Sequence, residues 1–378
     1  MSFSFLDVLL IIGITQGAVT ASLLLISKER KVSNLLLALA ILSFCLLSFK
    51  VLLNFMGISG ASAFRYIPNA TELAIAPLFY FYLVALTTKG FKVNLKLLGH
   101  FIPFIIAQLY AFLIYWQAWG YPTKELQDLA VQELFYTFIK RIEDFLIVAS
   151  IFIYLYLSSK KILIFQKQVR DRTADSTYPT LSWLKNNFIL STILFLFLIL
   201  NMSLDAMIDL DSKTELHWRL YFVYLAGIIY YLGFLGYRQK APDLDQIFDI
   251  DVKSDNGSEN TKISAHKAAQ ITESVQHLLK VDKIFLEPTL NARQVSERLK
   301  VSQTNLSLVI NKHFQRSFRD LINEHRIDDV KKKLLDADNK ASILSVALDS
   351  GFNSEASFYR VFKKKTGMSP KEFISQQA

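Results

Sequence analysis

Hydrophobic residues form long runs through the first 240 residues of the chain, and such runs are almost absent afterwards. Seven runs are apolar enough to be transmembrane helices, which need about 20 residues to cross a hydrocarbon core. They are Phe5–Ile26, Asn34–Phe55, Thr71–Thr88, Leu97–Trp116, Asp144–Leu157, Phe188–Ile208 and Trp218–Leu235. The pattern predicts an all-α protein whose residues 1–239 form a seven-helix transmembrane bundle.

The fifth run is the weakest, because charged residues interrupt its N-terminal end. Lys140 and Asp144 are four residues apart, the spacing at which opposite charges meet on one face of a helix. We expect this pair to neutralise itself where the helix enters the bilayer.

The lysines and arginines between the runs predict an orientation. No positive charge precedes the first run, whereas Lys28, Arg30 and Lys31 follow it. That order is unlike a secretory signal peptide and favours an external N-terminus. With this orientation the inner loops hold twelve Lys and Arg and the outer loops three or four. Because inner loops are enriched in positive charge, residues after 240 are predicted to be cytoplasmic at a bacterial inner membrane.

The composition changes abruptly after Tyr237. Residues 240–262 are acidic, carry Pro242 and Gly257, and show no helical stripe, which is typical of a flexible linker. Residues 263–378 are predicted to form a soluble all-helical domain. From Thr272 onward this part has 18 Lys and Arg against 13 Asp and Glu, a balance compatible with nucleic acid.

Two helix-turn-helix units are predicted in this domain. In the first, helices over Asn291–Leu299 and Ser302–Phe314 are joined by a tight turn with Ser302 as N-cap. In the second, Gly351 ends one helix and Ser354 begins the next. A long helix, Phe318–Asp336, joins the units and would span about 28 Å at 1.5 Å per residue. One chain would then reach two successive major-groove openings, which are about 34 Å apart.

The second unit reads IxxVAxxxGFxSxxxFxRxFKKxxGxSP from Ile343 to Pro370. Taken alone, this stretch is also compatible with two surface helices and a solvated lysine run. The register of its glycines, aromatics and proline closely resembles AraC-type (AraC/XylS) transcription regulators, over about Ile271–Phe373. The resemblance implies a domain that binds double-stranded DNA. No part of it covers the first 240 residues.

Side chains on the outer faces of the second helix of each unit are the candidate DNA contacts. For the first unit we expect Gln303, Thr304, Asn305 and Ser307 to face bases and Lys312 to face phosphate. For the second unit we expect Ser354, Glu355, Ser357, Tyr359, Arg360 and Lys363, with the basic pair at phosphates. N-capping and a solvated polar face are the alternative for each residue.

Three other positions bear on the resemblance. Arg326 resembles the family's arginine on the joining helix, where pairing with a carboxylate is as plausible as a DNA contact. Arg316 stands where relatives usually have glycine, and Leu308 where a basic residue is common. These departures favour fewer phosphate contacts in the first unit.

Ionisable residues inside the apolar runs are functional candidates, because buried membrane charges are costly. Asp205 and nearby Asn201 are the predicted ligand or partner site. Lys50 is expected to reach the outer surface and Glu72 to cap a helix, and His100 is a further ionisable residue at depth.

Catalytic signals are lacking in the sequence. It has no phosphate-binding loop, serine-nucleophile motif or paired-cysteine metal site, and its one cysteine, Cys45, lies in an apolar run. We therefore expect no enzyme activity, cofactor or metal, and a membrane-embedded regulator whose partners are double-stranded DNA, membrane lipid and an unknown ligand. Homodimerisation stays open. The alternative function is a transporter or receptor whose helical tail docks a protein and does not bind DNA.

Overall fold

The computed structural model describes residues 4–27, 31–58, 64–174, 178, 181–210, 213–238, 242, 244, 263–336, 338 and 340–377. These residues form helices and one isolated antiparallel bridge, with no strand among them. The predicted all-α fold class is therefore confirmed. The chain divides into two compact units, the first made of residues 1–162 and 181–241, the second of residues 163–180 and 242–378.

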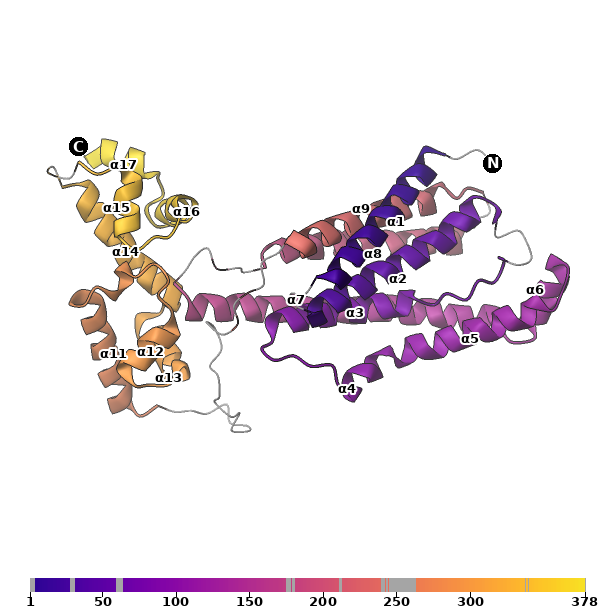
Figure 1. The fold of residues 1–378 in the computed structure, drawn as a ribbon, viewed down its shortest axis with the longest axis horizontal. Coiled ribbons are helices and arrows are strands. Elements are labelled where there is room, and N and C mark those ends of the chain that lie inside the picture. The colour runs from indigo at the N-terminus through magenta and orange to yellow at the C-terminus, as the bar shows by residue number, and fades with distance from the viewer. Residues whose placement is uncertain are drawn as a thin grey trace. The chain divides into compact units, whose positions relative to one another are not determined.

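The first unit is a bundle of long apolar helices that lie side by side (Figure 1). Its elements are α1 (Phe5–Ile26), α2 (Lys31–Phe55), α3 (Glu72–Thr87), α4 (Leu95–Leu98), η2 (Gly99–Phe101), α5 (Ile102–Trp119), α6 (Lys124–Gln132), the first part of α7 (Tyr136–Arg172), α8 (Trp183–Ile208) and α9 (Leu216–Arg238).

The predicted number of seven spans is slightly too high. Six helical segments in the described residues are long and apolar enough to cross a membrane, one of them made of α4, η2 and α5 together, and α3 falls short of the required length. Helix α3 has only 16 residues, shorter than the predicted Thr71–Thr88 run. The fifth predicted run is part of α7, a single helix of 37 residues. Its ion pair joins Lys140 to Glu143 at 2.7 Å, rather than to the predicted partner, Asp144.

Small residues let α9 approach the first two helices closely. A Cβ added at Gly13 of α1 would lie 2.4 Å from the Cβ of Ala226, and one at Gly236 of α9 would lie 2.4 Å from a methyl group of Leu37. Contacts of this kind favour helix association in lipid, where van der Waals packing replaces the hydrophobic effect. They fix α1, α2 and α9 as the tightly packed side of the bundle.

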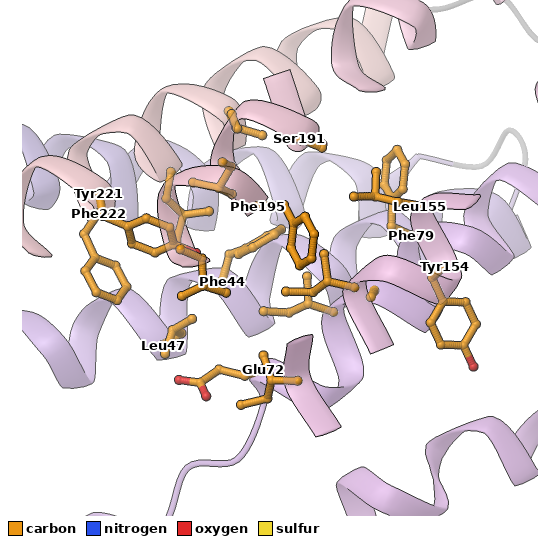
Figure 2. Close-up of a pocket in the computed structure, with 18 of the residues that line it drawn as sticks. Phe44, Leu47, Glu72, Phe79, Tyr154, Leu155, Ser191, Phe195, Tyr221 and Phe222 are labelled. Atoms are coloured by element: carbon orange, nitrogen blue, oxygen red, sulfur yellow. The ribbon is translucent and has the colours of Figure 1, made fainter. Parts of the chain in front are cut away.

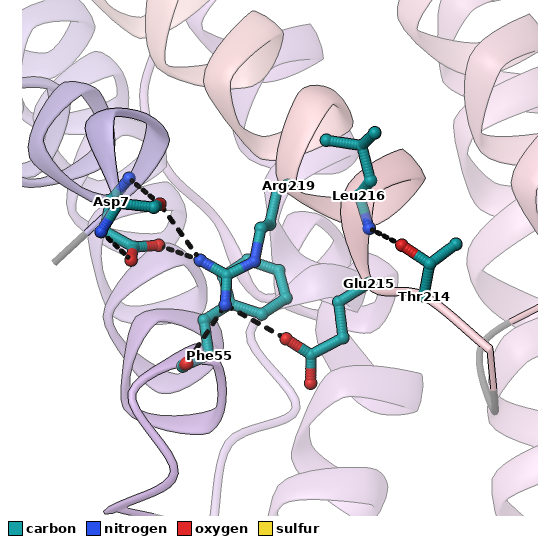
Figure 3. Close-up of polar contacts among 7 residues, drawn as sticks. Asp7, Phe55, Thr214, Glu215, Leu216 and Arg219 are labelled. Atoms are coloured by element: carbon teal, nitrogen blue, oxygen red, sulfur yellow. Dashed lines mark hydrogen bonds and ion pairs between the residues drawn. The ribbon is translucent and has the colours of Figure 1, made fainter. Parts of the chain in front are cut away.

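A polar cluster joins one end of these three helices (Figure 3). Arg219 of α9 forms an ion pair with buried Asp7 of α1 and donates to the Phe55 carbonyl oxygen of α2 at 3.0 Å. Its guanidinium group also lies 4.4 Å from the centre of the Phe55 ring. Because Asp7 also closes the capping box at Ser4, the cluster fixes the start of α1.

The second unit contains α11 (Ala265–Lys280), η3 (Ile284–Leu286), α12 (Ala292–Leu299), α13 (Gln303–Val309), η4 (Ile310–Phe314), α14 (Phe318–Leu334), α15 (Ile343–Asp349), α16 (Glu355–Thr366) and α17 (Pro370–Gln377). It has two apolar cores. Helix α14 supplies Leu321 and Ile322 to the first core, and Ile327 and Val330 to the second. The two halves of the unit are thus built on one shared helix.

Residues 163–174 also belong to this second unit. Thr173 forms the isolated antiparallel bridge with Asn291, and the Ala174 amide donates to the Leu290 carbonyl oxygen at 3.0 Å. Ala174 is fully buried in the first core. The boundary predicted at residue 239 stays a prediction, and the predicted linker 240–262 lies almost wholly outside the described residues.

Candidate nucleic-acid interface

The first half of the second unit places α13 across a tight turn from α12. Lys300 adopts a left-handed conformation with φ +53° at the end of α12, and the Ser302 hydroxyl accepts a hydrogen bond from the Asn305 amide at 3.2 Å. Val295 and Leu306 are buried where the helices meet. The helix-turn-helix geometry and the N-cap at Ser302 therefore agree with the sequence prediction.

The predicted base contacts of α13 do not all lie on its outer face. Thr304 and Lys312 are exposed, and Asn305 and Ser307 are half-buried. Gln303 is only 3% exposed. Its position explains this, because it precedes the buried Leu306 by three residues and Ile310 by seven, the spacing of one helical face. Gln303 is therefore not available for direct base contact in this conformation.

The turn after α13 accounts for the departure at Arg316. Residues Ile310–Phe314 form a π-helical turn, and Gln315, with φ +51°, takes the left-handed position. Arg316 therefore does not need the left-handed conformation, and its Nε donates to Glu324 of α14 at 3.4 Å. A glycine is not needed at 316, because the residue before it makes the reversal.

The second half of the unit begins α16 with the predicted turn. Gly351 has φ +91°, and the Ser354 hydroxyl accepts from the Ser357 amide at 3.3 Å. Phe358 and Phe362 are fully buried, as their four-residue spacing predicts. Together these contacts hold α16 with its apolar face against α14 and α15.

The outer face of α16 is polar at its start and basic toward its end. Glu355, Tyr359, Arg360 and Lys363 are exposed, and Ser354 is half-buried at the N-cap. Ser357 is only 3% exposed, because it lies four residues before Val361, which packs against the second core. Ser357, like Gln303, is thus turned inward and is not available for base contact.

Arg326 has a structural role, and its partners differ from the predicted carboxylate. The side chain is 1% exposed, and its guanidinium group donates to the carbonyl oxygens of Phe285 at 2.7 Å and Glu287 at 2.6 Å. It also lies 5.8 Å from the centre of the Phe352 ring. Arg326 therefore joins the first half of the unit to the second.

Glu324 links the two halves by charge. Its carboxylate accepts from Lys365 of α16 at 3.2 Å as well as from Arg316. Partial burial by itself would raise the pKa of Glu324, but the hydrogen bonds and charges of Lys365 and Arg316 outweigh burial and lower this pKa. The sequence placed Lys365 only in a basic run, so this contact was missed.

Helix α14 joins the two helix-turn-helix units, and its 17 residues span about 26 Å at 1.5 Å per residue. The predicted length was 19 residues, so the distance is close to the expected one. It remains comparable to the roughly 34 Å between successive major-groove openings on one face of DNA.

The predicted ligand residues in the bundle lie at one end of α8. Asp205 accepts from His217 Nε2 at 2.9 Å and Trp218 Nε1 at 2.8 Å. Asn201 is fully buried and donates to the His217 carbonyl oxygen at 3.3 Å, which is a structural contact. Lys50 donates to the Asn69 carbonyl oxygen at 3.4 Å, and His100 contacts Tyr154 at 2.7 Å.

The pairs α12–α13 and α15–α16 are two helix-turn-helix units that pack on the shared helix α14, so together they form a bipartite helix-turn-helix domain. Comparison with known proteins identifies its kind: residues 295–376 match the family described as "Helix-turn-helix domain". The predicted resemblance of this part of the chain to AraC-type domains is thus confirmed.

Curated relatives match only a part of the chain. The "Melibiose operon regulatory protein" of Escherichia coli K12 is 33% identical over 93 residues, which are 24% of this chain and 30% of the regulator. The protein of the same name from Escherichia coli O6:H1 (strain CFT073) matches with the same identity and coverage. The chain therefore spans less than a third of the length of these relatives, and no solved structure matches it.

Proposed function

We propose that this protein is a membrane-embedded, sequence-specific DNA-binding transcription regulator. The observation that carries the proposal is the pair of helices α13 and α16. Each has a buried apolar face and a polar first turn, and exposed basic residues follow, Lys312 in η4 after α13 and Arg360 and Lys363 within α16. Helix α14, about 26 Å long, joins the two motifs, compared with about 34 Å between successive groove openings. The name of the melibiose operon regulatory protein, to which this domain is similar, supports the same function.

The residues divide by the part of DNA that they suit. Thr304, Asn305 and Ser307 of α13, which are exposed or half-buried, are the proposed base contacts. Asn305 suits adenine, which asparagine can bind through two hydrogen bonds. Lys312, Arg360 and Lys363 suit phosphates. The groove-facing candidates of the second helix-turn-helix unit are Ser354, Glu355 and Tyr359, at the start of α16. Gln303 and Ser357 are excluded by their burial.

The test is DNA binding by the full-length protein in lipid nanodiscs, using a site selected from random duplexes. Arg360→Ala and Lys363→Ala should weaken binding to every sequence and each reduce the salt dependence by about one phosphate contact. Asn305→Ala should cost about 1–3 kcal/mol and relax preference at one base pair. Lys267→Ala, on exposed α11, is the matched control and should bind as the wild type does.

The alternative function makes a different prediction for the same measurement. A helical tail that docks a protein would have no salt-dependent affinity for duplex DNA. Retention of full affinity in the Arg360→Ala, Lys363→Ala double variant would also contradict the proposed interface.

The membrane location is proposed from the bundle. Six helical segments have the length and hydropathy of membrane spans, and the basic residues concentrate on the side that leads to the helix-turn-helix domain. We propose that α3, which is apolar but has only 16 residues, crosses the membrane as well, because an external N-terminus and a cytoplasmic second unit need an odd number of crossings. DNA is then accessible to the second unit.

Helix α7 is the proposed route for a signal. It is one continuous helix, and its residues 163–172 count with the second unit. Directly after it, Thr173 pairs with Asn291, the N-cap of α12, and Arg319 Nε of α14 donates to the Thr173 carbonyl oxygen at 3.1 Å. A shift or rotation of α7 would therefore act directly on the first helix-turn-helix unit.

Two glycines inserted after Arg172 test this route. The insertion interrupts the connection between α7 and Thr173 and removes no side chain. Chromatin mapping in the host should then show promoter occupancy that no longer changes with growth conditions. The same insertion at residue 251, in the acidic segment, is the matched control and should leave the response intact. Equal responses of the two variants would contradict a signal carried by α7.

A further inference from the structure

The helical bundle contains a cavity of about 440 Å³ that none of the functions above explains. Its walls come from α2, α3, α7, α8 and α9, and aliphatic and aromatic side chains dominate them (Figure 2). All of its lining residues belong to the first unit.

The cavity is elongated along α8. Its lining residues on that helix run from Asn187 through Ser191, Phe195 and Leu198 to Asp205, a single stripe at helical spacing. Eighteen residues separate the ends of this stripe, which is about 27 Å at 1.5 Å per residue. A slot of this shape suits an extended hydrocarbon chain rather than a compact ring.

One end of the slot is acidic. Glu72 is the first residue of α3, Asp144 lies in the third turn of α7, and Asp205 lies in the last turn of α8. None of the described residues that line the cavity is Lys, Arg or His. Lys50 and Lys140, outside the lining, act on Glu72 by charge. Three helices thus contribute carboxylates to one cavity, and His217 and Trp218 already donate to Asp205. Glu72 and Asp144 are the carboxylates left for a ligand.

The two lysines near this end are engaged elsewhere. Lys50 donates to the Asn69 carbonyl oxygen at 3.4 Å, and Lys140 pairs with Glu143 at 2.7 Å. Within the described residues, Glu72 has neither a hydrogen bond nor an ion pair inside 4.0 Å. An excess of carboxylates in a low-dielectric bundle is costly, and a bound cation would offset that cost.

The other end of the slot is also polar and incomplete. Asn187 is 1% exposed and lines the cavity, and its Oδ1 accepts no hydrogen bond from any residue that the structure describes. A buried acceptor without a donor costs about 1–3 kcal/mol. This unsatisfied acceptor is independent of the acidic end, and it supports a ligand in the slot.

We propose that the cavity binds a single-chain amphiphile with a cationic ammonium head. The ammonium head lies beside Glu72 and Asp144, and the chain lies along α8 toward Asn187. This inference rests on the proposed membrane location, in which the acidic end of the cavity faces the outside of the cell and the ligand enters from there. Asp144 and Ser158 of α7 line the slot, so a bound ligand would contact α7. Directly after α7, Thr173 pairs with Asn291, the N-cap of α12.

Dodecylamine, which is cationic at neutral pH, is the probe, and dodecanol and dodecyl sulfate are its neutral and anionic controls. Full-length protein in phosphatidylcholine nanodiscs is labelled with a photoreactive dodecylamine, and the labelled peptides are mapped. Labelling should fall on α7 and α8, and excess dodecylamine should prevent it whereas the two controls should not. Labelling that dodecanol prevents equally well, or a retained phospholipid that dodecylamine does not displace, overturns the proposal.

Glu72→Gln should lower the affinity for dodecylamine about tenfold and leave any weak dodecanol binding unchanged. Glu125→Gln, an exposed carboxylate of α6 outside the cavity, is the control and should bind normally. Ala76→Phe, which fills the slot without changing charge, should abolish binding. Unchanged affinity in both Glu72→Gln and Ala76→Phe contradicts the site.

The binding measurement needs no DNA, so it separates this site from the proposed function. Saturable dodecylamine binding with no duplex affinity would support the cavity and contradict the regulator. Duplex affinity without dodecylamine binding would support the regulator and overturn the proposed ligand.

Discussion

At the scale of single residues, two N-cap serines and the buried Arg326 stabilise the second unit. Ser302 and Ser354 cap their helices as expected, because an N-cap depends on residues two or three positions away. Arg326 was predicted to pair with a carboxylate, yet it donates to two backbone carbonyl groups about 40 residues earlier. No local pattern encodes such a pairing, since it depends on how the two halves of the unit meet.

Two glycines test how closely those halves approach. Gly351 and Gly367 both have left-handed φ angles, +91° and +82°. An added Cβ at Gly351 would lie 2.3 Å from the Phe285 carbonyl oxygen, whereas at Gly367 nothing lies within 4 Å. Gly367→Ala should therefore cost about 1–2 kcal/mol, the strain of a left-handed residue, and Gly351→Ala distinctly more. Chemical denaturation of the full-length variants measures both, and equal losses would contradict the close contact.

Glu324 predicts a pH dependence. Its pKa is lowered in the folded protein, so its contribution to stability is present above the ordinary value of 4.5 and is lost as the pH falls through the lowered pKa. Glu324→Gln should reduce the melting temperature of the second unit at neutral pH. Wild type and variant should converge as acid protonates Glu324.

Glu297→Gln is the control for this titration, because the one ion pair of Glu297 with a described residue is with Arg293, on the exposed face of α12. It should change the melting temperature little at any pH, as expected of an exposed pair. A gap between wild type and Glu324→Gln that persists in acid would show that packing, rather than charge, connects the halves.

At the scale of elements, the sequence predicted the helices and only partly their faces. The apolar spacing of Phe358 and Phe362 was sufficient to orient α16. Gln303 and Ser357 were assigned outward because they are polar, although the residues at helical spacing from them are buried or packed against the core. Position on the helical stripe, rather than polarity, would have placed both correctly.

The two faces of α16 should separate stability from DNA binding. Phe358→Ala empties a fully buried site and should cost about 3–5 kcal/mol of unfolding free energy. Tyr359→Ala removes the adjacent exposed side chain and should leave stability nearly unchanged while weakening duplex binding. Denaturation and nanodisc binding assays on the same preparations measure both effects. A Tyr359→Ala variant with normal DNA affinity would remove this residue from the interface.

At the scale of the whole molecule, hydropathy predicted the apolar bundle and motif register predicted the helix-turn-helix domain. Neither predicted the contacts after α7, because Thr173 and Asn291 lie 118 positions apart and their pairing involves backbone groups. The acidic end of the cavity was missed for a similar reason. Glu72, Asp144 and Asp205 lie on three helices, and only the packing of those helices brings them to one cavity.

The orientation of the bundle is the prediction on which the remaining proposals depend, and the chain offers a direct test. Its single cysteine, Cys45, is buried, and Cys45→Ala removes its background reactivity. In that background Lys124→Cys, at the start of α6, should react with a membrane-impermeant maleimide in intact cells. Ser264→Cys, at the N-cap of α11, should react only after the cells are permeabilised. Labelling of Ser264→Cys in intact cells would place the helix-turn-helix domain on the side of the membrane away from DNA, and a protein so oriented could not regulate transcription by the proposed mechanism.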